Sequence, residues 1–443
     1  MVHVIYIHSH DTGRYVQPYG HAIPTPRIQQ LAEEGVLFRQ AFCANPTCSP
    51  SRACLLTGQW AHSCGMGGLV NRGWSLPHPE RLLPAYLRGC GYQTVRTGIQ
   101  HVVKDPLEGG YERIEGGDGG DEGAVDRAVD FIAEAHDRPF FLDVGFGVTH
   151  RKAEVFDDPP DGEERTDPRY LKPPAPLPDT PETRSDMALY VDAARRLDQL
   201  VGRVVDAVDR CGLREETLII CTTDHGMAFP RMKCNLTDHG MGVMLVLRGP
   251  GGFTGGQVVD GLASHVDLFP TLCDVAGLAA PDWLQGTSLR PLVEGADSVR
   301  AAVFAEINYH VCYEPQRAVR TARWKYIQRQ HDRARPVLPD CDDSLSKDYL
   351  LENGWAEREE AAERLYDVVF DPNEAHNLAA DPTYADVLDE LRAQLHSWRE
   401  QTGDPLLEQP VFMPPETAQI ADPDERSPRK APAHSARTLL GLD

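Results

Sequence analysis

Short strand-like runs alternate with helical runs up to about residue 280, and this alternation constrains the fold more than any other feature of the chain. One helical run has apolar residues at steps of three and four from Val191 to Val208, which form a single apolar face. The alternation predicts an α/β fold with a large mixed, mostly parallel sheet sandwiched by helices. The strand-like runs, rich in β-branched and aromatic residues, are 4–7, 36–38, 92–96, 140–144, 218–222 and 243–247.

The pattern changes after about residue 298. Two antiparallel-looking strands, 302–309 and 317–328, precede a helix at about 384–401. We therefore expect a main domain at 1–297, a smaller α+β subdomain at 298–405 and a Pro-rich C-terminal tail at 406–443 that wraps or frays.

Turn-forming residues mark further boundaries. Thr25 can cap a helix that begins at Pro26 and stops at Gly35. Segments 105–123 and 152–180 are rich in Gly, Asp, Pro and Glu, so we expect exposed loops that form the rim of a pocket.

Composition excludes several classes of partner. A net charge of −23 argues against nucleic acid, because neutralising phosphates requires clustered Lys and Arg. No run approaches the roughly 20 apolar residues of a membrane helix, so we expect no membrane span. The chain starts directly with a strand-like run rather than a leader segment, which predicts a cytoplasmic protein. The eleven cysteines lack paired CxxC spacings, so we expect most of them to be reduced core residues.

The most informative stretch is Cys48-Ser49-Pro50-Ser51-Arg52, which continues to Thr57-Gly58. Ser49 suits a helix cap, Pro50 the first helical position and Gly58 the stop, which places Cys48 at a helix N-terminus. Such a terminus attracts anions, and we expect it to lower the pKa of the thiol.

Histidine and aspartate pairs follow two of the predicted strands. His10-Asp11 comes after the first strand, and Asp224-His225 comes after strand 218–222. Ligands gather at the carboxyl ends of parallel strands, so we expect these side chains to lie together at a binding site.

The Cys48–Gly58 stretch resembles the signature of the sulfatase family, within the alkaline-phosphatase-like superfamily. The resemblance covers nearly the whole chain, and within the family it is strongest to the heparan N-sulfatase (sulfamidase) branch. Other segments that resemble the family are Thr25-Pro26, 264–271 and 365–379. The likeness to the heparan N-sulfatase branch rests on Phe140-Phe141-Leu142 leading to His150-Arg151, on Phe229-Pro230 and on the Trp398 to Pro405 ending.

The resemblance implies a nucleophile and a metal. Cys48 would be oxidised to formylglycine by a formylglycine-generating enzyme, with Pro50 and Arg52 completing its recognition motif and Arg52 steadying the hydrated aldehyde. The family binds one divalent metal, usually Ca²⁺, with two adjacent Asp and an Asp-Asn pair. Asp11 and Asp224 match that pattern, whereas His10 and His225 depart from it and move the preference toward Mn²⁺, Mg²⁺ or Zn²⁺. The implied metal site is Asp11, Asp224, His225, His10 and Cys48.

The resemblance also implies residues that handle the transferred group. His150 fits the histidine near the leaving atom, Lys233 fits a cation that contacts sulfate, and His101 fits the histidine that hydrogen-bonds formylglycine. Ile99 stands where the family usually has Lys, and Lys104 cannot be assumed to replace it.

The expected function is hydrolysis of a sulfate ester or sulfamate, on a sulfated carbohydrate or similar small anionic substrate. One alternative is a phosphonate monoester or phosphodiester hydrolase of the same superfamily, which His225 favours. Another is a non-catalytic relative that binds metal or an anionic sugar, which Ile99 favours. We expect substrate selection by the loop 152–180 and by the subdomain, with His310, Tyr313 and Arg317 as candidates.

Overall fold

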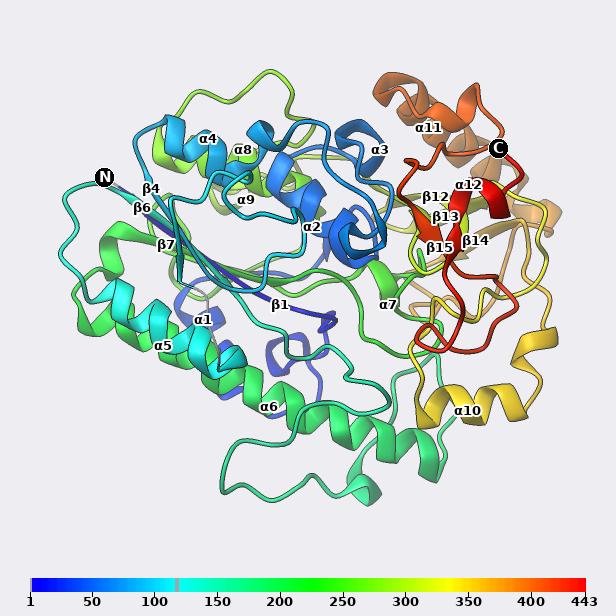
Figure 1. The fold of residues 1–443 in the computed structure, drawn as a ribbon, viewed down its shortest axis with the longest axis horizontal. Coiled ribbons are helices and arrows are strands. Elements are labelled where there is room, and N and C mark those ends of the chain that lie inside the picture. Colours follow the sequence, from blue (N-terminus) through cyan, green and yellow to red (C-terminus); the bar gives the residue numbers. More distant parts are fainter. Residues whose placement is uncertain (1, 116–118) are drawn as a thin grey trace.

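The main element of the computed structural model, which describes residues 2–115 and 119–443, is an eight-stranded sheet (Figure 1). Strand β8 pairs antiparallel with both of its neighbours, while the other adjacent pairs are parallel. The sheet is therefore mixed and mostly parallel, as the sequence predicts. Across the sheet the order is β5 (Arg113–Glu115), β4 (Gln93–Gly98), β6 (Phe140–Gly145), β1 (His3–Ser9), β7 (Thr217–Thr223), β8 (Leu245–Arg248), β2 (Val36–Phe38) and β9 (Gln257–Val259).

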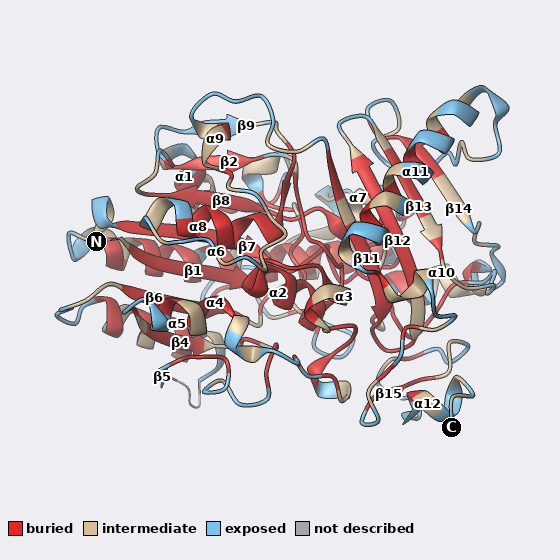
Figure 2. Ribbon diagram, turned by 90° about the horizontal axis from the view of Figure 1, so that it is seen from above, coloured by how far each residue is buried: buried red, intermediate tan, exposed pale blue. Residues whose placement is uncertain are grey.

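Both faces of this sheet are covered. Along β1, Val4 and Tyr6 belong to one apolar core, and Ile5 and Ile7 belong to another. This is the two-residue period of a strand with helices on either side. Figure 2 shows the central strands buried along their length, in agreement with full burial of β1, β6, β7 and β8.

Two helical layers provide this cover (Figure 1). One layer consists of α1 (Pro26–Glu34), α5 (Gly120–Ile132) and the long α6 (Pro181–Arg210). The other consists of α2 (Cys48–Thr57), α4 (Leu83–Gly89), α8 (Leu268–Ala276) and α9 (Arg290–Val293). The remaining short elements of this part are α3 (Ala61–Cys64), α7 (Asp238–Met241) and the paired strands β3 (Ala41–Phe42) and β10 (Ala263–Ser264).

A separate antiparallel sheet follows α9 and has the order β11-β12-β13-β14. The prediction of one strand over 317–328 is wrong, because an exposed turn at Ala322 and Arg323 separates β12 from β13. That turn contains neither Gly nor Pro, so the usual sequence signal is missing. The elements are β11 (Ala302–Tyr309), β12 (Tyr313–Thr321), β13 (Trp324–Arg329), α10 (Leu345–Glu352), β14 (Glu363–Asp367) and α11 (Ala385–Thr402).

The C-terminal tail packs back onto the chain. The Tyr309 hydroxyl donates to the Phe412 carbonyl, and the Ala421 amide donates to the Val311 carbonyl. The tail therefore wraps the subdomain. It contains β15 (Gln419–Ile420), β16 (His434–Ser435) and α12 (Ala436–Leu439).

The boundary predictions have mixed outcomes. Helix α1 has the predicted limits at Pro26 and Gly35, although the Thr25 side chain makes no capping bond. Segment 105–123 includes the edge strand β5 and the start of α5, so the prediction of a continuous loop is wrong; residues 116–118 lie outside the described residues. The domain limits at residues 297 and 405 stay predictions, the first of them falling between α9 and β11.

All eleven cysteines are free thiols, and Cys90 and Cys211 are the exposed ones. Within residues 2–115 and 119–443, the structure has no helix whose length and apolar character would let it cross a bilayer.

Candidate active site

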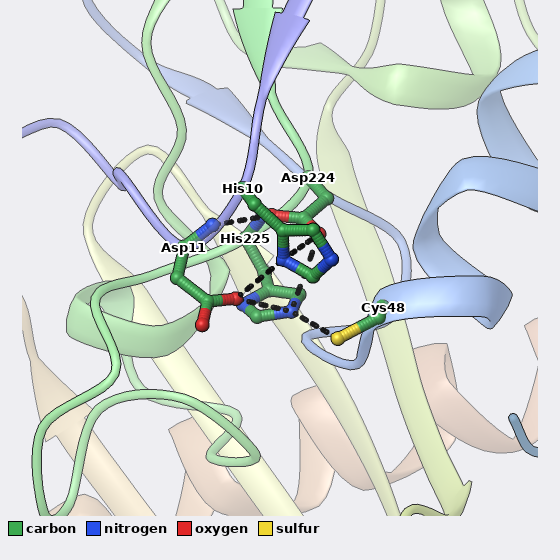
Figure 3. Close-up of side chains that lie close together, drawn as sticks. All are labelled: His10, Asp11, Cys48, Asp224 and His225. Atoms are coloured by element: carbon green, nitrogen blue, oxygen red, sulfur yellow. Dashed lines mark hydrogen bonds and ion pairs between the residues drawn. The ribbon is translucent and has the colours of Figure 1, made fainter. Parts of the chain in front are cut away.

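Two adjacent strands and one helix N-terminus meet at a single point (Figure 3). Strands β1 and β7 are parallel, with Ser9 opposite Thr223, so the residues that follow them emerge side by side. Helix α2 begins at Cys48 and points its N-terminus at the same place. We call the resulting group the Cys48 cluster; it consists of His10, Asp11, Cys48, Asp224 and His225, with one potential ligand atom of each lying within 4.8 Å of the others.

The cap of α2 differs in detail from the prediction. Thr47, not Ser49, is the N-cap, and Cys48 is the first helical residue. Pro50 is tolerated at the third position, because the first amides of a helix have no partner within it. Gly58 ends the helix in the left-handed region with φ 66°, as predicted.

Backbone conformation and backbone amides orient the two carboxylates of the cluster. Asp11 has φ 57°, a left-handed conformation that Asp tolerates better than most residues. Its amide donates to Asp224 Oδ1 at 2.8 Å, and the His225 amide donates to the same oxygen at 2.9 Å. Asp224 Oδ2 is thereby turned toward His10, whose Nδ1 lies 3.1 Å away.

The histidine His225 has the geometry of a metal ligand. Its Nδ1 lies 3.0 Å from the Gly226 carbonyl, which can only accept, so Nδ1 carries the proton. With that proton on Nδ1, Nε2 is the ring nitrogen left to bind a metal, and it lies 3.3 Å from Asp11 Oδ1 and 3.5 Å from Cys48 Sγ. Lone pairs that face one another in a buried site are stabilised by a cation between them, so these residues fit a divalent metal.

Ionisation in the cluster also suits a cation site. Although burial opposes it, Lys233, together with neighbouring histidines, holds the pKa of Asp11 well below its usual value. Burial lowers the pKa of His10 to about 3 despite both carboxylates, so this ring is neutral at pH 7. Carboxylates that stay ionised and imidazoles that stay neutral are the forms that bind metals.

The thiol of Cys48 departs from the sequence prediction. Burial raises its pKa above the ordinary value, and the charges of Asp11 and Asp224 contribute to the rise. The prediction of a lowered pKa is therefore wrong, because the helix N-terminus is closed off from solvent and faces two carboxylates. An unmodified thiol here is a weak nucleophile at neutral pH.

Two cations contact the cluster. Arg52 donates from Nη2 to Asp224 Oδ2 at 3.0 Å. Lys233 donates to Asp11 Oδ2 at 2.9 Å and to Asp342 Oδ2 at 3.1 Å. Sequence reasoning missed Asp342, because this acid lies in a Pro- and Asp-containing loop far along the chain with no periodic pattern to place it.

Two further predicted histidines lie beside the cluster. His150 Nε2 is 4.0 Å from Asp11 Oδ2, its ring packs edge-on against His10, and its side chain is 33% exposed. The His101 ring lies 6.0 Å from that of His10. Since His150 is much more exposed than the cluster, solvent reaches the site on its side. Lys104 is exposed at the surface.

The three candidates for substrate selection have different surroundings. Arg317 is fully buried and forms a bidentate ion pair with Asp404, so the prediction that it helps to select substrate is wrong. The Tyr313 hydroxyl accepts from the Phe412 amide inside the subdomain. His310 remains closer to the site, 3.6 Å from Asp340, which lies two residues before Asp342.

A cavity of about 180 Å³ adjoins Lys233 on the side of the C-terminal sheet. We call it the subdomain cavity. Its polar and charged lining includes Lys233, His239, Glu314, Arg329, Asp340, Arg364 and Glu374.

Comparison with known proteins gives consistent results along the chain. Residues 3–278 match the family described as Sulfatase, and residues 228–344 match the family described as N-sulphoglucosamine sulphohydrolase, C-terminal. Human N-sulphoglucosamine sulphohydrolase is 31% identical over 440 residues, which cover 87% of each chain.

Solved structures share the fold. A protein in complex with its substrate D-glucosamine-2-N,6-O-disulfate superposes with a TM-score of 0.70 at 19% identity, covering 92% of this chain and 100% of the other. Phosphonate monoester hydrolase of Agrobacterium radiobacter gives a TM-score of 0.71 at 22% identity, covering 91% and 96%.

Proposed function

Since the chain belongs to the sulfatase family, we propose that it hydrolyses a sulfate ester or sulfamate at the Cys48 cluster. The observation that carries the proposal is the convergence of Cys48 with two carboxylates and two imidazoles at one buried point. Such a group combines a nucleophile position with the ligands of a single cation.

Asp11, Asp224 and His225 would hold one divalent metal, with His10 and residue 48 completing the set. A metal there would acidify the nucleophile and neutralise oxygens of the transferred group. The family resemblance implies Ca²⁺, but the imidazole of His225 favours Mn²⁺, Mg²⁺ or Zn²⁺, because Ca²⁺ prefers oxygen ligands.

Cys48 would be converted to formylglycine by a formylglycine-generating enzyme. Formylglycine would supply, as its hydrate, one hydroxyl as the nucleophile toward sulfur and a second hydroxyl whose deprotonation would release sulfate and restore the aldehyde. The raised pKa of the buried thiol supports this conversion, because cysteine itself would be largely protonated.

The surrounding side chains have distinct roles in the proposal. His150, whose side chain is 33% exposed, donates a proton to the departing oxygen or nitrogen. His101 accepts the proton of the second hydroxyl at residue 48. Lys233 binds sulfate oxygens and holds Asp11 beside it, while Arg52 holds Asp224 and steadies the hydrated aldehyde at residue 48.

The substrate would be a sulfated carbohydrate. Supporting this, the human relative is named for N-sulphoglucosamine, and a protein of the same fold binds a disulfated glucosamine. The match of residues 228–344 to the C-terminal family of that relative favours an N-sulfated sugar.

The test compares rates on an aryl sulfate, N-sulfoglucosamine, a phosphate monoester and a phosphodiester, using protein with measured formylglycine content. We expect the two sulfur substrates to be fastest, and loss of all turnover in Cys48→Ala. Faster phosphodiester than sulfate turnover would instead assign the chain to the phosphonate hydrolase type, which also fits His225.

A further inference from the structure

A histidine interrupts the apolar run of strand β1 two residues before the Cys48 cluster. His8 is 1% exposed and lies between β6 and β7, which pair with β1 on either side. Its Nε2 is 2.7 Å from Asp143 Oδ1, and Asp143 in turn accepts from the Tyr111 hydroxyl. None of these three residues belongs to the site proposed above.

The partners of His8 determine which nitrogen carries its proton. Nη1 of Arg52 contacts His8 Nδ1, and a guanidinium can only donate, so Nδ1 accepts. The remaining ring nitrogen, Nε2, therefore carries the proton and donates to Asp143. A carboxylate behind a histidine fixes the ring tautomer in this way.

Arg52 is held at both ends of its guanidinium. Nη1 donates to His8, while Nη2 donates to the Ser9 carbonyl and to Asp224 Oδ2, both at 3.0 Å. Arg52 lies one helical turn after Cys48 on α2, so its orientation determines which of its donors face residue 48 and Asp224. Among residues 2–115 and 119–443, His8 Nδ1 is the hydrogen-bond partner of Arg52 Nη1.

The His8 ring also lies at the strand end that carries Ile99. A side chain on Gly145 would collide with the Ile99 carbonyl and with the His8 ring, which shows how closely the three residues pack. The resemblance predicts a lysine at position 99, so one cation expected near the nucleophile is absent from this strand end. The orientation of Arg52 is consequently more important in this chain for placing positive charge near residue 48.

We propose that His8 is a positioning residue that holds Arg52 toward residue 48 and Asp224, with Asp143 fixing the ring tautomer. The role in turnover rests on the function proposed above, but the effect on Arg52 does not. His8 touches no substrate in this account and acts only through the arginine.

Three variants test the proposal. His8→Phe keeps a flat ring that can stack on Tyr6, as His8 does at 4.5 Å, but removes the acceptor for Arg52. His8→Asn keeps an acceptor in the place of Nδ1 and loses the link to Asp143. Asp143→Leu keeps His8 and removes the group that fixes its tautomer.

His3→Phe is the matched control. His3 lies at the other end of β1, is also buried, and stacks on Phe140. It reports what replacing a buried β1 histidine does to folding alone, measured as Tm.

We expect His8→Phe to lower kcat by about 10-fold or more with KM changed much less, because a displaced arginine impairs the chemical step. His8→Asn should restore most of the rate, and Asp143→Leu should fall between. A His8→Phe variant as active as His3→Phe, a His8→Asn variant as slow as His8→Phe, or an Asp143→Leu variant with wild-type kcat would overturn the assignment.

Crystal structures of the same variants give a readout that needs no substrate. In His8→Phe we expect Arg52 Nη2 to leave Asp224 Oδ2, and in His8→Asn to stay within hydrogen-bond distance. An unmoved Arg52 in His8→Phe would contradict the inference even if the wild type hydrolyses sulfate.

A wild type without sulfate or sulfamate turnover, but with the predicted movement of Arg52, would refute the proposed function alone. If His8→Phe does not fold, wild-type kcat and an unmoved Arg52 in Asp143→Leu decide against the proposal.

Discussion

The Cys48 cluster and the subdomain cavity both contain many buried charged groups, but the pKa values of their carboxylates are shifted in opposite directions. In the cluster, the nearby cations and histidines hold the pKa values of Asp11 and Asp224 below their usual range. In the cavity, burial raises the pKa of Glu314 to about 8, with Asp340 adding to the rise, and burial raises that of Glu374 to about 7.

The difference lies in how the charges are arranged. In the cluster, side chains from two strand ends and a helix N-terminus converge on one point, and three of the four carboxylate oxygens accept from the Asp11 amide, Arg52 or Lys233. In the cavity, several lining atoms, such as Asp340 Oδ2 and Arg364 Nε, have no hydrogen-bond partner among the described residues. Convergence on a point, rather than the number of charged groups, distinguishes a site built for chemistry.

The largest expected difference between the two regions comes from a pair of buried cysteines. Cys48→Ala should lower kcat by at least about 10³-fold, because it removes the nucleophile. Cys234→Ala, on the cavity wall, should keep kcat within about threefold, since surface and packing changes away from reacting atoms act mainly on stability. Rates with the fastest sulfur substrate, with Tm as the folding control, test the pair.

A Cys48→Ala protein with the wild-type rate would remove residue 48 from the mechanism. Equal losses in both cysteine variants would mean that the two regions are not functionally distinct.

The second-largest expected difference between the two regions is in metal affinity. Asp224→Asn should weaken Mn²⁺ binding by about 100-fold or more, because it removes a charged ligand from the cluster. Glu314→Gln, in the cavity, should leave the Kd unchanged. Titration calorimetry with Mn²⁺ alone compares them; unaltered affinity in Asp224→Asn would place the metal elsewhere.

Lys233 lies between the two regions, so its replacement sharpens the comparison. Lys233→Met should lower kcat/KM by about 10- to 100-fold, because a donor to the sulfate oxygens is lost. Asp342→Asn keeps the lysine and removes only one of its two carboxylate partners, so we expect a smaller loss. Steady-state kinetics measures both values of kcat/KM. A larger loss in Asp342→Asn than in Lys233→Met would contradict the role of Lys233.

The smallest expected effect is the pH dependence of stability caused by Glu314. Its folded pKa of about 8 lies above the unfolded value of about 4.5, so the folded state holds the proton more tightly. Proton binding by Glu314 therefore adds to the free energy of unfolding. This contribution is complete below the unfolded pKa and is lost as pH rises toward 8, at up to about 1.4 kcal/mol per pH unit.

Glu314→Gln should therefore lose less stability than the wild type between pH 5 and pH 8, as measured by chemical denaturation. Parallel pH profiles for the two proteins would show that Glu314 is ionised in the fold. Asp224→Asn should show no such flattening, because the pKa of Asp224 is lowered rather than raised.

The sequence predicted those parts of the site that depend on local chain geometry. Strand ends and a helix start give Asp11, Asp224 and Cys48 a common location as soon as the sheet is parallel. The same reasoning predicted the two-faced sheet and the limits of α1. His8 could have been noticed as a polar residue within an apolar strand, but its partner Asp143 is 135 residues away and follows only from strand order.

Tertiary contacts account for what could not be predicted. Asp342 reaches Lys233 from the loop between β13 and α10, and no local pattern places that loop. Arg317 was a candidate for substrate contact, yet Asp404, near the start of the C-terminal tail, accepts from its Nε and Nη2. The raised pKa of Cys48 depends on burial by residues from several elements, which the helix motif alone does not reveal.

The most direct test of the account is an anomalous-scattering map from a crystal soaked with Mn²⁺ and sulfate. We predict one manganese peak about 2.0–2.3 Å from carboxylate oxygens of Asp11 and Asp224 and from Nε2 of His225, with sulfate between that peak and residue 48. A map with manganese bound elsewhere, or with the cluster empty at saturating metal, would contradict the claim that this cluster is the centre of the chemistry.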